Sequence, residues 1–239
     1  KLSSKLIRTL KYKVTFSTDG EDAILSKYFS GFEKGNYIDI GSNHPVYLSN
    51  TFLFYLNNWK GICLDPLPNL EKKYKLFRPR DLFINSGILS KINKSKLKYY
   101  YYQDNPDCST FDISRVDKLK RDFNRYPTLV NEISTISAKD LIKLSNKFFK
   151  NLNEIHLLNI DTEGFEYEIC KDFFSENIFP WIICIEELGY NAENIVLSNV
   201  YKLMKKNNYF LSSRTFLSSI YVRSDILSKF PSPYLKELI

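Results

Sequence analysis

Residues 36–45 read NYIDIGSNHP, and residues 60–66 read KGICLDP. Each segment is a short apolar run that leads into an acidic residue and a loop former, and a helix-length segment separates the two, as in a strand-helix-strand unit. The turn after Ile40 offers backbone N–H groups, and Asp65 follows the second strand at the same sheet edge. A carboxylate about 20 residues beyond a glycine turn suits the hydroxyls of a ribose. The stretch therefore predicts a nucleoside-containing cofactor.

The rest of the chain continues the alternation of strands and helices. Apolar residues at helical spacing follow the acidic segment 19–22 and return at 48–56, 67–77, 165–174 and 194–206. Strands are predicted at 37–40, 62–64, 82–88, 155–161, 181–185, 209–211 and 217–222, the last two antiparallel to each other. This order predicts an α/β fold of the class I methyltransferase (Rossmann-like) type, doubly wound, with a mostly parallel sheet and one late antiparallel strand. We expect one domain over residues 1–239, with residues 1–35 as a helical lead-in.

The alternation breaks down between the third and fourth predicted strands, over residues 92–150. Here we expect strands at 97–102 and 133–136, a loop at 104–110, a polar, charged segment up to Pro127, and a helix at 138–144. Loops and insertions on a rigid scaffold commonly carry ligand contacts, so the segment is a candidate for substrate specificity. The alternative is an edge hairpin that covers the sheet.

Composition and charge describe an ordinary globular chain. Lys plus Arg is 34 and Asp plus Glu is 27, and the excess of +7 is spread along the chain, as on a solvated surface or on one that meets an anionic partner. Four cysteines without a CxxC pair favour free thiols in a reducing cytoplasm, and two histidines make a histidine metal site unlikely to form. No apolar run has the roughly 18 residues of a membrane span, and no signal-peptide core is present near the beginning. The sequence begins at Lys1 without Met, so we expect it could belong to a longer polypeptide.

Acidic or polar side chains stand at the ends of five predicted strands. They are Asp39, Asp65, Asn85, Asp161 and Glu186. In a doubly wound sheet the carboxyl ends of parallel strands meet at one edge, where ligands bind. The G-x-G-x-x-G turn of a dinucleotide oxidoreductase and the G-x4-G-K-[ST] loop of a nucleotide triphosphatase are both absent from the sequence. A nucleoside cofactor without a pyrophosphate fits better.

The chain also carries a series of short motifs in a fixed order. They are Phe16-Ser17 ahead of Gly20-Glu21-Asp22, DIGSNHP at 39–45, LSNT at 48–51, WKGI at 59–62, LDP at 64–66 and LNIDTEGFE at 158–166. With this combination, residues 16–222 resemble the FkbM-type S-adenosylmethionine-dependent methyltransferases. Thr18 stands where that family often has Gln.

The resemblance implies S-adenosylmethionine as the cofactor and assigns residues to it. Asp39, Gly41, Ser42 and Asn43 would surround the methionine part. Asp65, followed by Pro66, would hold the ribose hydroxyls, Asn85 and Ser86 would lie by the adenine, and Asp161 would lie near the sulfonium. The alternative for Asp39 is an ion pair with a basic residue, and the alternative for Asp65 is that it caps the following helix.

Transfer of a methyl group to a hydroxyl needs a general base close to that hydroxyl. The candidate catalytic residues are His44, Asp161, Glu163 and Glu187. His44 could instead fix its own turn ahead of Pro45, and Glu163 could serve the positive end of the helix that follows it. Together with Glu186, the three carboxylates could also assemble a magnesium or calcium site, but we assign no metal ligand and do not favour a metal.

The sequence thus predicts a methyltransferase that O-methylates a sugar, a glycan or another small polar acceptor. The alternative is a catalytically inactive methyltransferase-like domain that binds or regulates within a larger polypeptide. A nucleic-acid methyltransferase is disfavoured, because DTEG at 161–164 stands where an N-methylating Asn/Asp-Pro-Pro-aromatic tetrapeptide would be expected. We therefore expect a small-molecule or glycan partner, no nucleic acid and no transmembrane segment.

Overall fold

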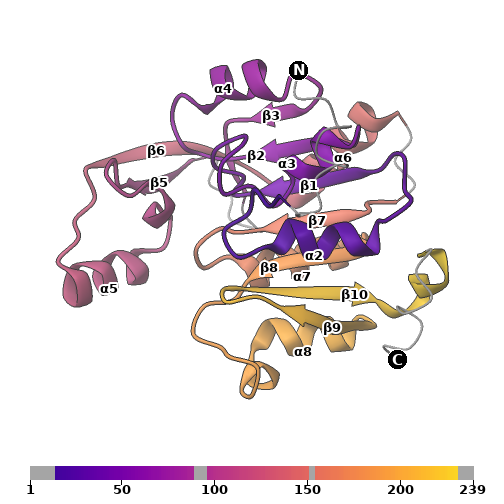
Figure 1. Cartoon of the computed structure of the whole chain (residues 1–239). Coiled ribbons are helices and arrows are strands. Elements are labelled where there is room, and N and C mark those ends of the chain that lie inside the picture. The colour runs from indigo at the N-terminus through magenta and orange to yellow at the C-terminus, as the bar shows by residue number, and fades with distance from the viewer. Residues whose placement is uncertain (1–13, 89–95, 151–153, 231–239) are drawn as a thin grey trace.

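The structure is a computed structural model that describes residues 14–88, 96–150 and 154–230 (Figure 1). The first part of the expected N-terminal lead-in, residues 1–13, lies outside the described residues. The first described helix, α2, spans Glu21–Tyr28 and begins after Gly20, with Glu21 and Asp22 in its first turn. Acidic residues there face the positive end of the helix dipole, as predicted.

The centre of the molecule is a sheet of seven strands in the order β3-β2-β1-β7-β8-β10-β9. The strands span Asn36–Ile40 (β1), Lys60–Leu64 (β2), Leu82–Ile84 (β3), Leu157–Ile160 (β7), Ile182–Glu186 (β8), Tyr209–Arg214 (β9) and Ser218–Arg223 (β10). The pairs formed by β1, β2, β3, β7 and β8 are all parallel, and β10 runs antiparallel to both of its neighbours. The prediction of a mostly parallel α/β sheet is confirmed.

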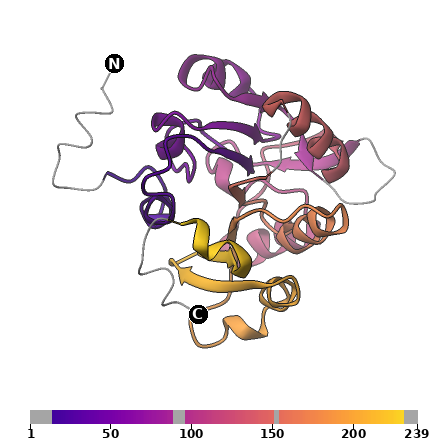
Figure 2. The same cartoon turned by 90° about the vertical axis from the view of Figure 1, so that its right-hand side faces the viewer.

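Alternate residues of the strands face two separate apolar layers. In β1, Tyr37 packs into the layer beneath α2, whereas Ile38 and Ile40 pack into the opposite layer. Viewed edge-on in Figure 2, α2 lies on one side of the sheet, and α6 and α7 lie on the other. Because both faces are covered, the sheet edge at the carboxyl ends of the strands is left as the place for a ligand.

The remaining helices follow the predicted order with changed bounds. They span Phe52–Leu56 (α3), Leu70–Phe77 (α4), Ala138–Phe149 (α6), Glu166–Ser175 (α7) and Asn199–Lys206 (α8), and short 3₁₀ turns cover Ile195–Leu197 (η2) and Ser224–Lys229 (η3). The helix expected at 194–206 is thus divided, because Ser198 caps α8 by accepting a hydrogen bond from Tyr201 N. Among the described residues, no helix combines the length and the apolar character that crossing a bilayer requires.

A second, smaller sheet stands beside the main one, and the part of the chain at residues 96–136, which we call the arm, supplies two of the three strands of this sheet (Figure 1). Its strands are Gly87–Ile88 (β4), Lys96–Tyr101 (β5) and Leu129–Ile136 (β6), and between β5 and β6 lie a 3₁₀ turn at Pro106–Cys108 (η1) and helix Ile113–Phe123 (α5). The polar, charged segment expected up to Pro127 contains a helix, α5, that the sequence analysis did not predict. The end of the expected insertion also differs, since α6 packs on the main sheet through Leu141 and Ile142.

Candidate active site

A cavity of about 360 Å³ lies at the carboxyl ends of the central strands, and we call it the first cavity. Its walls come from the turn after β1, the ends of β2, β7 and β8, and the arm. The predicted residues Asp39, Gly41, Ser42, Asn43, Asp65, Pro66, Ser86, Asp161 and Glu163 all line it. The arrangement of strands therefore brings most of the predicted site together.

The turn after β1 is held tightly against the loop after β7. Gly41 has φ 77°, and a Cβ atom added to it would lie 1.6 Å from the Asp161 carbonyl oxygen. Its N–H donates to Leu64 O at 2.9 Å, as does the N–H of Ser42 at 3.0 Å. A residue with a side chain would meet both a disfavoured backbone conformation and a steric clash. Gly41 thus sets the close approach of these two loops.

Asp65 ties the end of β2 to the same turn. Its Oδ2 accepts from Asn43 N at 2.7 Å, and its Oδ1 accepts from Leu67 N at 2.7 Å. Asn85 lies behind it: its Nδ2 donates to Asp65 O and Leu67 O, both at 2.8 Å, and Asn85 does not line the cavity. Asn85 therefore supports the Asp65 segment from behind, whereas Ser86 reaches the cavity wall.

Asp39 is buried at the floor of the first cavity and is part of a hydrogen-bond network. Thr51 Oγ1 donates to its Oδ2 at 2.5 Å, and Asn159 Nδ2 donates to its Oδ1 at 2.9 Å. Burial raises the pKa of the Asp39 carboxyl, and the nearby Arg78 guanidinium opposes that rise. An unpaired carboxylate at this depth would be costly, so the hydrogen bonds explain how it is tolerated.

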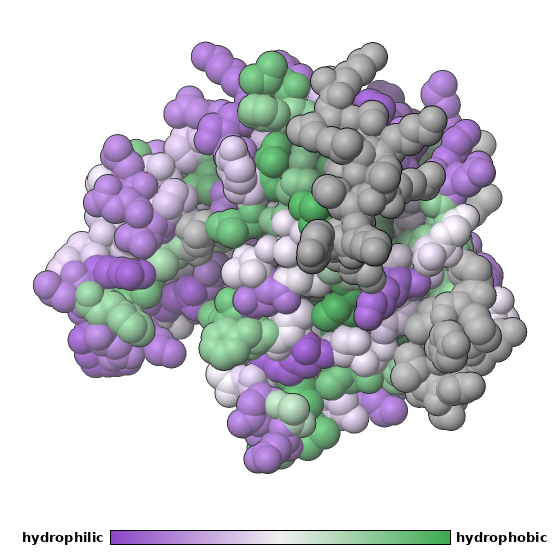
Figure 3. Space-filling view, in the orientation of Figure 1, coloured by the Kyte–Doolittle hydropathy of each residue, from purple (hydrophilic) through white to green (hydrophobic). Residues whose placement is uncertain are grey.

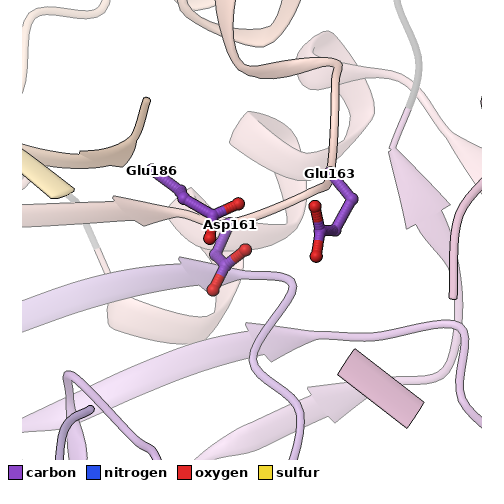
Figure 4. A group of neighbouring side chains, drawn as sticks. All are labelled: Asp161, Glu163 and Glu186. Atoms are coloured by element: carbon purple, nitrogen blue, oxygen red, sulfur yellow. The ribbon is translucent and has the colours of Figure 1, made fainter. Parts of the chain in front are cut away.

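Three carboxylates meet in the first cavity, from Asp161, Glu163 and Glu186, and we call them the acid cluster (Figure 4). One oxygen of each lies within 4.8 Å of the other two. Asp161 follows β7 and Glu186 ends β8, and Figure 4 shows Glu163 pointing its carboxyl toward Asp161 from the loop. Glu163 has φ 58°, a left-handed backbone conformation that is uncommon for Glu. Such conformations occur most often at functional sites.

The acid cluster holds its protons more tightly than free carboxyl groups do. Limited hydration, and then the neighbouring Glu186 carboxylate, raise the pKa of Asp161, although the Asp161 side chain faces the open cavity. Burial raises the pKa of Glu163 to about 8, against the effect of Arg115, and burial with the Glu163 carboxylate raises that of Glu186 to about 8. Near neutral pH the cluster therefore shares protons among its carboxyl groups.

With this geometry established, comparisons with known proteins decide the family. A sequence model described as the methyltransferase FkbM domain matches residues 39–211. The chain belongs to the FkbM methyltransferase family. A comparison with curated protein sequences gives no match. The FkbM match begins within β1 and ends within β9, so it includes the arm and, apart from Thr18 and Leu217, the residues that line the first cavity.

In this FkbM domain, the arm contacts the acid cluster directly. Arg115 of α5 forms an ion pair with Glu163, and Thr110 Oγ1 donates to Glu163 O at 3.2 Å. On the other side of the loop, Glu166 accepts hydrogen bonds from the N–H groups of Thr162 and Gly164. The strained conformation of Glu163 is thus fixed by partners on both sides.

Two predicted catalytic residues of the FkbM domain lie away from the first cavity. His44 does not line it; Nδ1 of His44 accepts from Val46 N and Tyr47 N, each at 3.2 Å, and its ring stacks on Tyr47. Glu187 is buried and accepts hydrogen bonds from Ser198 Oγ at 2.5 Å and Tyr221 Oη at 2.7 Å. The catalytic roles of both therefore remain predictions, and the contacts of His44 are those of a residue that fixes its own turn.

The structure adds residues to the site that the sequence did not single out. Asn159 is a polar residue within the buried strand β7. A polar side chain at such a position indicates a hydrogen-bond partner inside the protein, and this could have been noticed in the sequence. Arg115 was hidden in the polar segment, where the local signal for α5 is Asp112, the residue that caps the start of the helix. Arg78 carried no signal, because the contacts that link it to the site are with residues distant in the sequence.

Proposed function

We propose that this FkbM-family protein transfers a methyl group from S-adenosylmethionine to a hydroxyl of a sugar or another small polar acceptor. The observation that carries the proposal is that the first cavity has two parts with different side chains. Asp65 stands on one side of the Gly41 turn, at the end of β2, and the acid cluster stands on the other side, at the ends of β7 and β8. A ribose needs a carboxylate that accepts from its hydroxyls, as Asp65 can, and methyl transfer to a hydroxyl needs a general base, as the acid cluster can supply.

The residues of the first cavity fit such a cofactor. Asp65 supplies a carboxylate for hydroxyl groups, and the apolar Leu67 and Ile88 beside it suit an adenine ring. Ser42 is buried, and among the described residues its hydroxyl has no hydrogen-bond partner, so it is available for the polar methionine end. The backbone N–H groups that Gly41 and Ser42 donate to Leu64 fix the shape of this wall.

The chain's own residues orient the acceptor and take its proton, while the bound cofactor supplies an electrophilic methyl group. A carboxylate of the acid cluster accepts the hydroxyl proton, because the pKa values of Glu163 and Glu186, raised to about 8, leave a fraction of the cluster ionised and strongly basic at neutral pH, and both side chains line the cavity. Asp161, which lines only the first cavity, presents negative charge toward the cofactor. These roles extend the predictions for Asp161 and Glu163.

A divalent metal is not required by this proposal. Three clustered carboxylates could hold a hard cation, but Arg115 already brings a positive charge to Glu163. We expect methyl transfer to be unchanged after treatment with EDTA and dialysis. A loss of transfer that magnesium or calcium restores would refute the metal-independent form of the proposal.

Calorimetry with S-adenosylmethionine is the first test. We expect one binding site, with affinity about 10- to 100-fold lower in Asp65→Ala, since hydrogen bonds to a charged group are worth about 1.5–3 kcal/mol. Asp117→Ala, which removes an exposed carboxylate on α5 that does not line the first cavity, is the control and keeps the affinity. Absence of binding, or equal binding by the two variants, would contradict the proposal.

Transfer of a tritiated methyl group separates an enzyme from an inactive domain. Incubated with cell extract, the wild-type protein should label a glycan or small-molecule fraction, and acid hydrolysis should release an O-methylated product. Labelling of nucleic acid alone would exclude the proposed acceptor class, and no labelling would favour the inactive domain.

We also propose that the protein works in a reducing cytoplasmic compartment. This is supported by its four free thiols, those of Cys63, Cys108, Cys170 and Cys184.

A further inference from the structure

A second cavity, of about 340 Å³, opens beside the first one. It lies between α5 of the arm, the N-terminal end of α7 and the segment from β8 to α8. Figure 3 shows the surface hollowed between the arm, at the left, and the lower part of the molecule where α8 lies. The two cavities share Arg115, Glu163, Glu186 and Leu188 in their walls. They therefore meet at the acid cluster.

We propose that the second cavity is the acceptor groove and that it takes an uncharged glycoside, with the reacting hydroxyl between Glu163 and Glu186. The inference rests on the proposed function, because it assigns the first cavity to the cofactor. Of the acid cluster, Asp161 lines only the first cavity, whereas Glu163 and Glu186 line both. A group seated in the groove thus lies beside these two carboxyl groups, in the part of the wall that the groove shares with the first cavity.

The side chains of the groove match hydroxyl groups rather than ionic ones. Glu163 and Glu186 line the groove, and a carboxylate oxygen of Asp161 lies within 4.8 Å of theirs, so an anionic acceptor would add repulsion there. Neutral hydroxyls can donate to a carboxylate and accept from a carboxylic acid. Tyr167 and Tyr190 in the walls add apolar ring surface together with polar hydroxyl groups. This combination of carboxyl groups and aromatic rings suits a sugar.

The arm selects the acceptor through Arg115. This side chain is half-buried, lines both cavities and is held by its ion pair with Glu163. Lys118, one helical turn further along α5, is exposed and lines the outer part of the groove. The arm and the acid cluster are therefore coupled, so a change in the arm changes the place where the acceptor hydroxyl sits.

Saturation-transfer NMR tests the groove without methyl transfer. The probe is a mixture of methyl glycosides of the common hexoses and 6-deoxyhexoses, added to the protein with S-adenosylhomocysteine. We expect signals from at least one glycoside, lost in Asn199→Trp, which places an indole in the groove from α8. Lys205→Trp, an exposed position on the same helix outside both cavities, is the matched control and keeps the signals.

The outcomes separate this inference from the proposed function. Absence of glycoside signals, or equal signals from Asn199→Trp and wild type, would overturn the groove even where S-adenosylmethionine binds and methyl transfer occurs. Failure of S-adenosylmethionine to bind in calorimetry would instead refute the proposed function. In an extract assay, Asn199→Trp should reduce tritium transfer about tenfold or more while its affinity for S-adenosylmethionine stays within about twofold of wild type.

Discussion

Arg78 Nε lies 2.7 Å from Asp81 Oδ2, and both side chains are completely buried beneath the first cavity. The rest of the guanidinium group donates to Tyr37 Oη at 2.8 Å and to Thr51 Oγ1 at 2.9 Å. Thr51 in turn donates to Asp39. A fully buried cation thus connects the end of α4 with the floor of the first cavity.

Replacing Arg78 should strongly destabilise the protein. Arg78→Met leaves the Asp81 carboxylate buried without its ion-pair partner, and breaking such a pair costs about 3–5 kcal/mol. Urea unfolding followed by circular dichroism measures the change. Arg121→Met, which breaks an exposed ion pair with Asp122, is the control and should cost about 0–1 kcal/mol. Similar losses in the two variants would show that the buried pair has no special role.

The Thr51 hydroxyl should contribute more than the Thr51 methyl group to the stability of the protein and to the binding of S-adenosylmethionine. Thr51→Val keeps the shape but removes the donor to Asp39 and the acceptor for Arg78, and an unsatisfied buried polar group costs about 1–3 kcal/mol. Thr51→Ser retains the hydroxyl and should stay close to wild type. The readouts are urea unfolding and calorimetry with S-adenosylmethionine, in which only Thr51→Val should bind more weakly. Equal behaviour of Val and Ser at this position would disprove the connection.

Local sequence patterns were enough to predict the sheet and the first cavity. The apolar runs around Ile38 and Ile62 and the acids after them are properties of adjacent residues, and a parallel sheet necessarily aligns their carboxyl ends. The loop after β7 was predicted in the same way, because Asp161 follows an apolar run that forms a strand parallel to β1. This is why most of the residues predicted to bind the cofactor lie together at the first cavity.

Contacts between distant residues could not be predicted in this way. Arg78 reaches the turn after β1 only because α4 folds back beneath it, and nothing near Arg78 in the sequence indicates that path. His44 was attractive as the histidine of a ligand-facing loop, but the direction of its ring depends on the backbone of the turn. The arm was missed in part because α5 buries only Val116 and Leu119, too few positions to give a strong helical pattern.

Gly41 should be intolerant of any side chain. Gly41→Ala meets a positive φ and a Cβ position 1.6 Å from Asp161 O, so the β1 turn and the β7 loop must separate. Gly189 is a matched control, because it has φ 82° but no atom within 4 Å of an added Cβ. Gly189→Ala should cost only the conformational strain, about 1–2 kcal/mol, and should bind S-adenosylmethionine normally. Calorimetry should show binding lost in Gly41→Ala; retained binding would contradict the close-approach explanation.

The acid cluster should make the protein less stable as the pH rises. In the folded protein the pKa values of Glu163 and Glu186 are raised to about 8, so the folded state binds more protons than the unfolded state between the ordinary Glu pKa and about 8. This contribution to the free energy of unfolding is fully present below the unfolded pKa and is lost as the pH rises through about 8. Thermal unfolding without ligand, from pH 5 to pH 8.5, should show it.

Glu186→Gln removes one charge from the cluster and should flatten this dependence. The variant should melt above wild type at pH 8.5, by about 2–4 °C for each kcal/mol of repulsion removed, and the difference should shrink toward pH 5. Glu168→Gln, an exposed position on α7, is the control and should follow the wild-type curve. Parallel curves for Glu186→Gln and wild type would show that the cluster is ionised throughout this range. They would also remove the physical basis for a base that titrates near neutral pH.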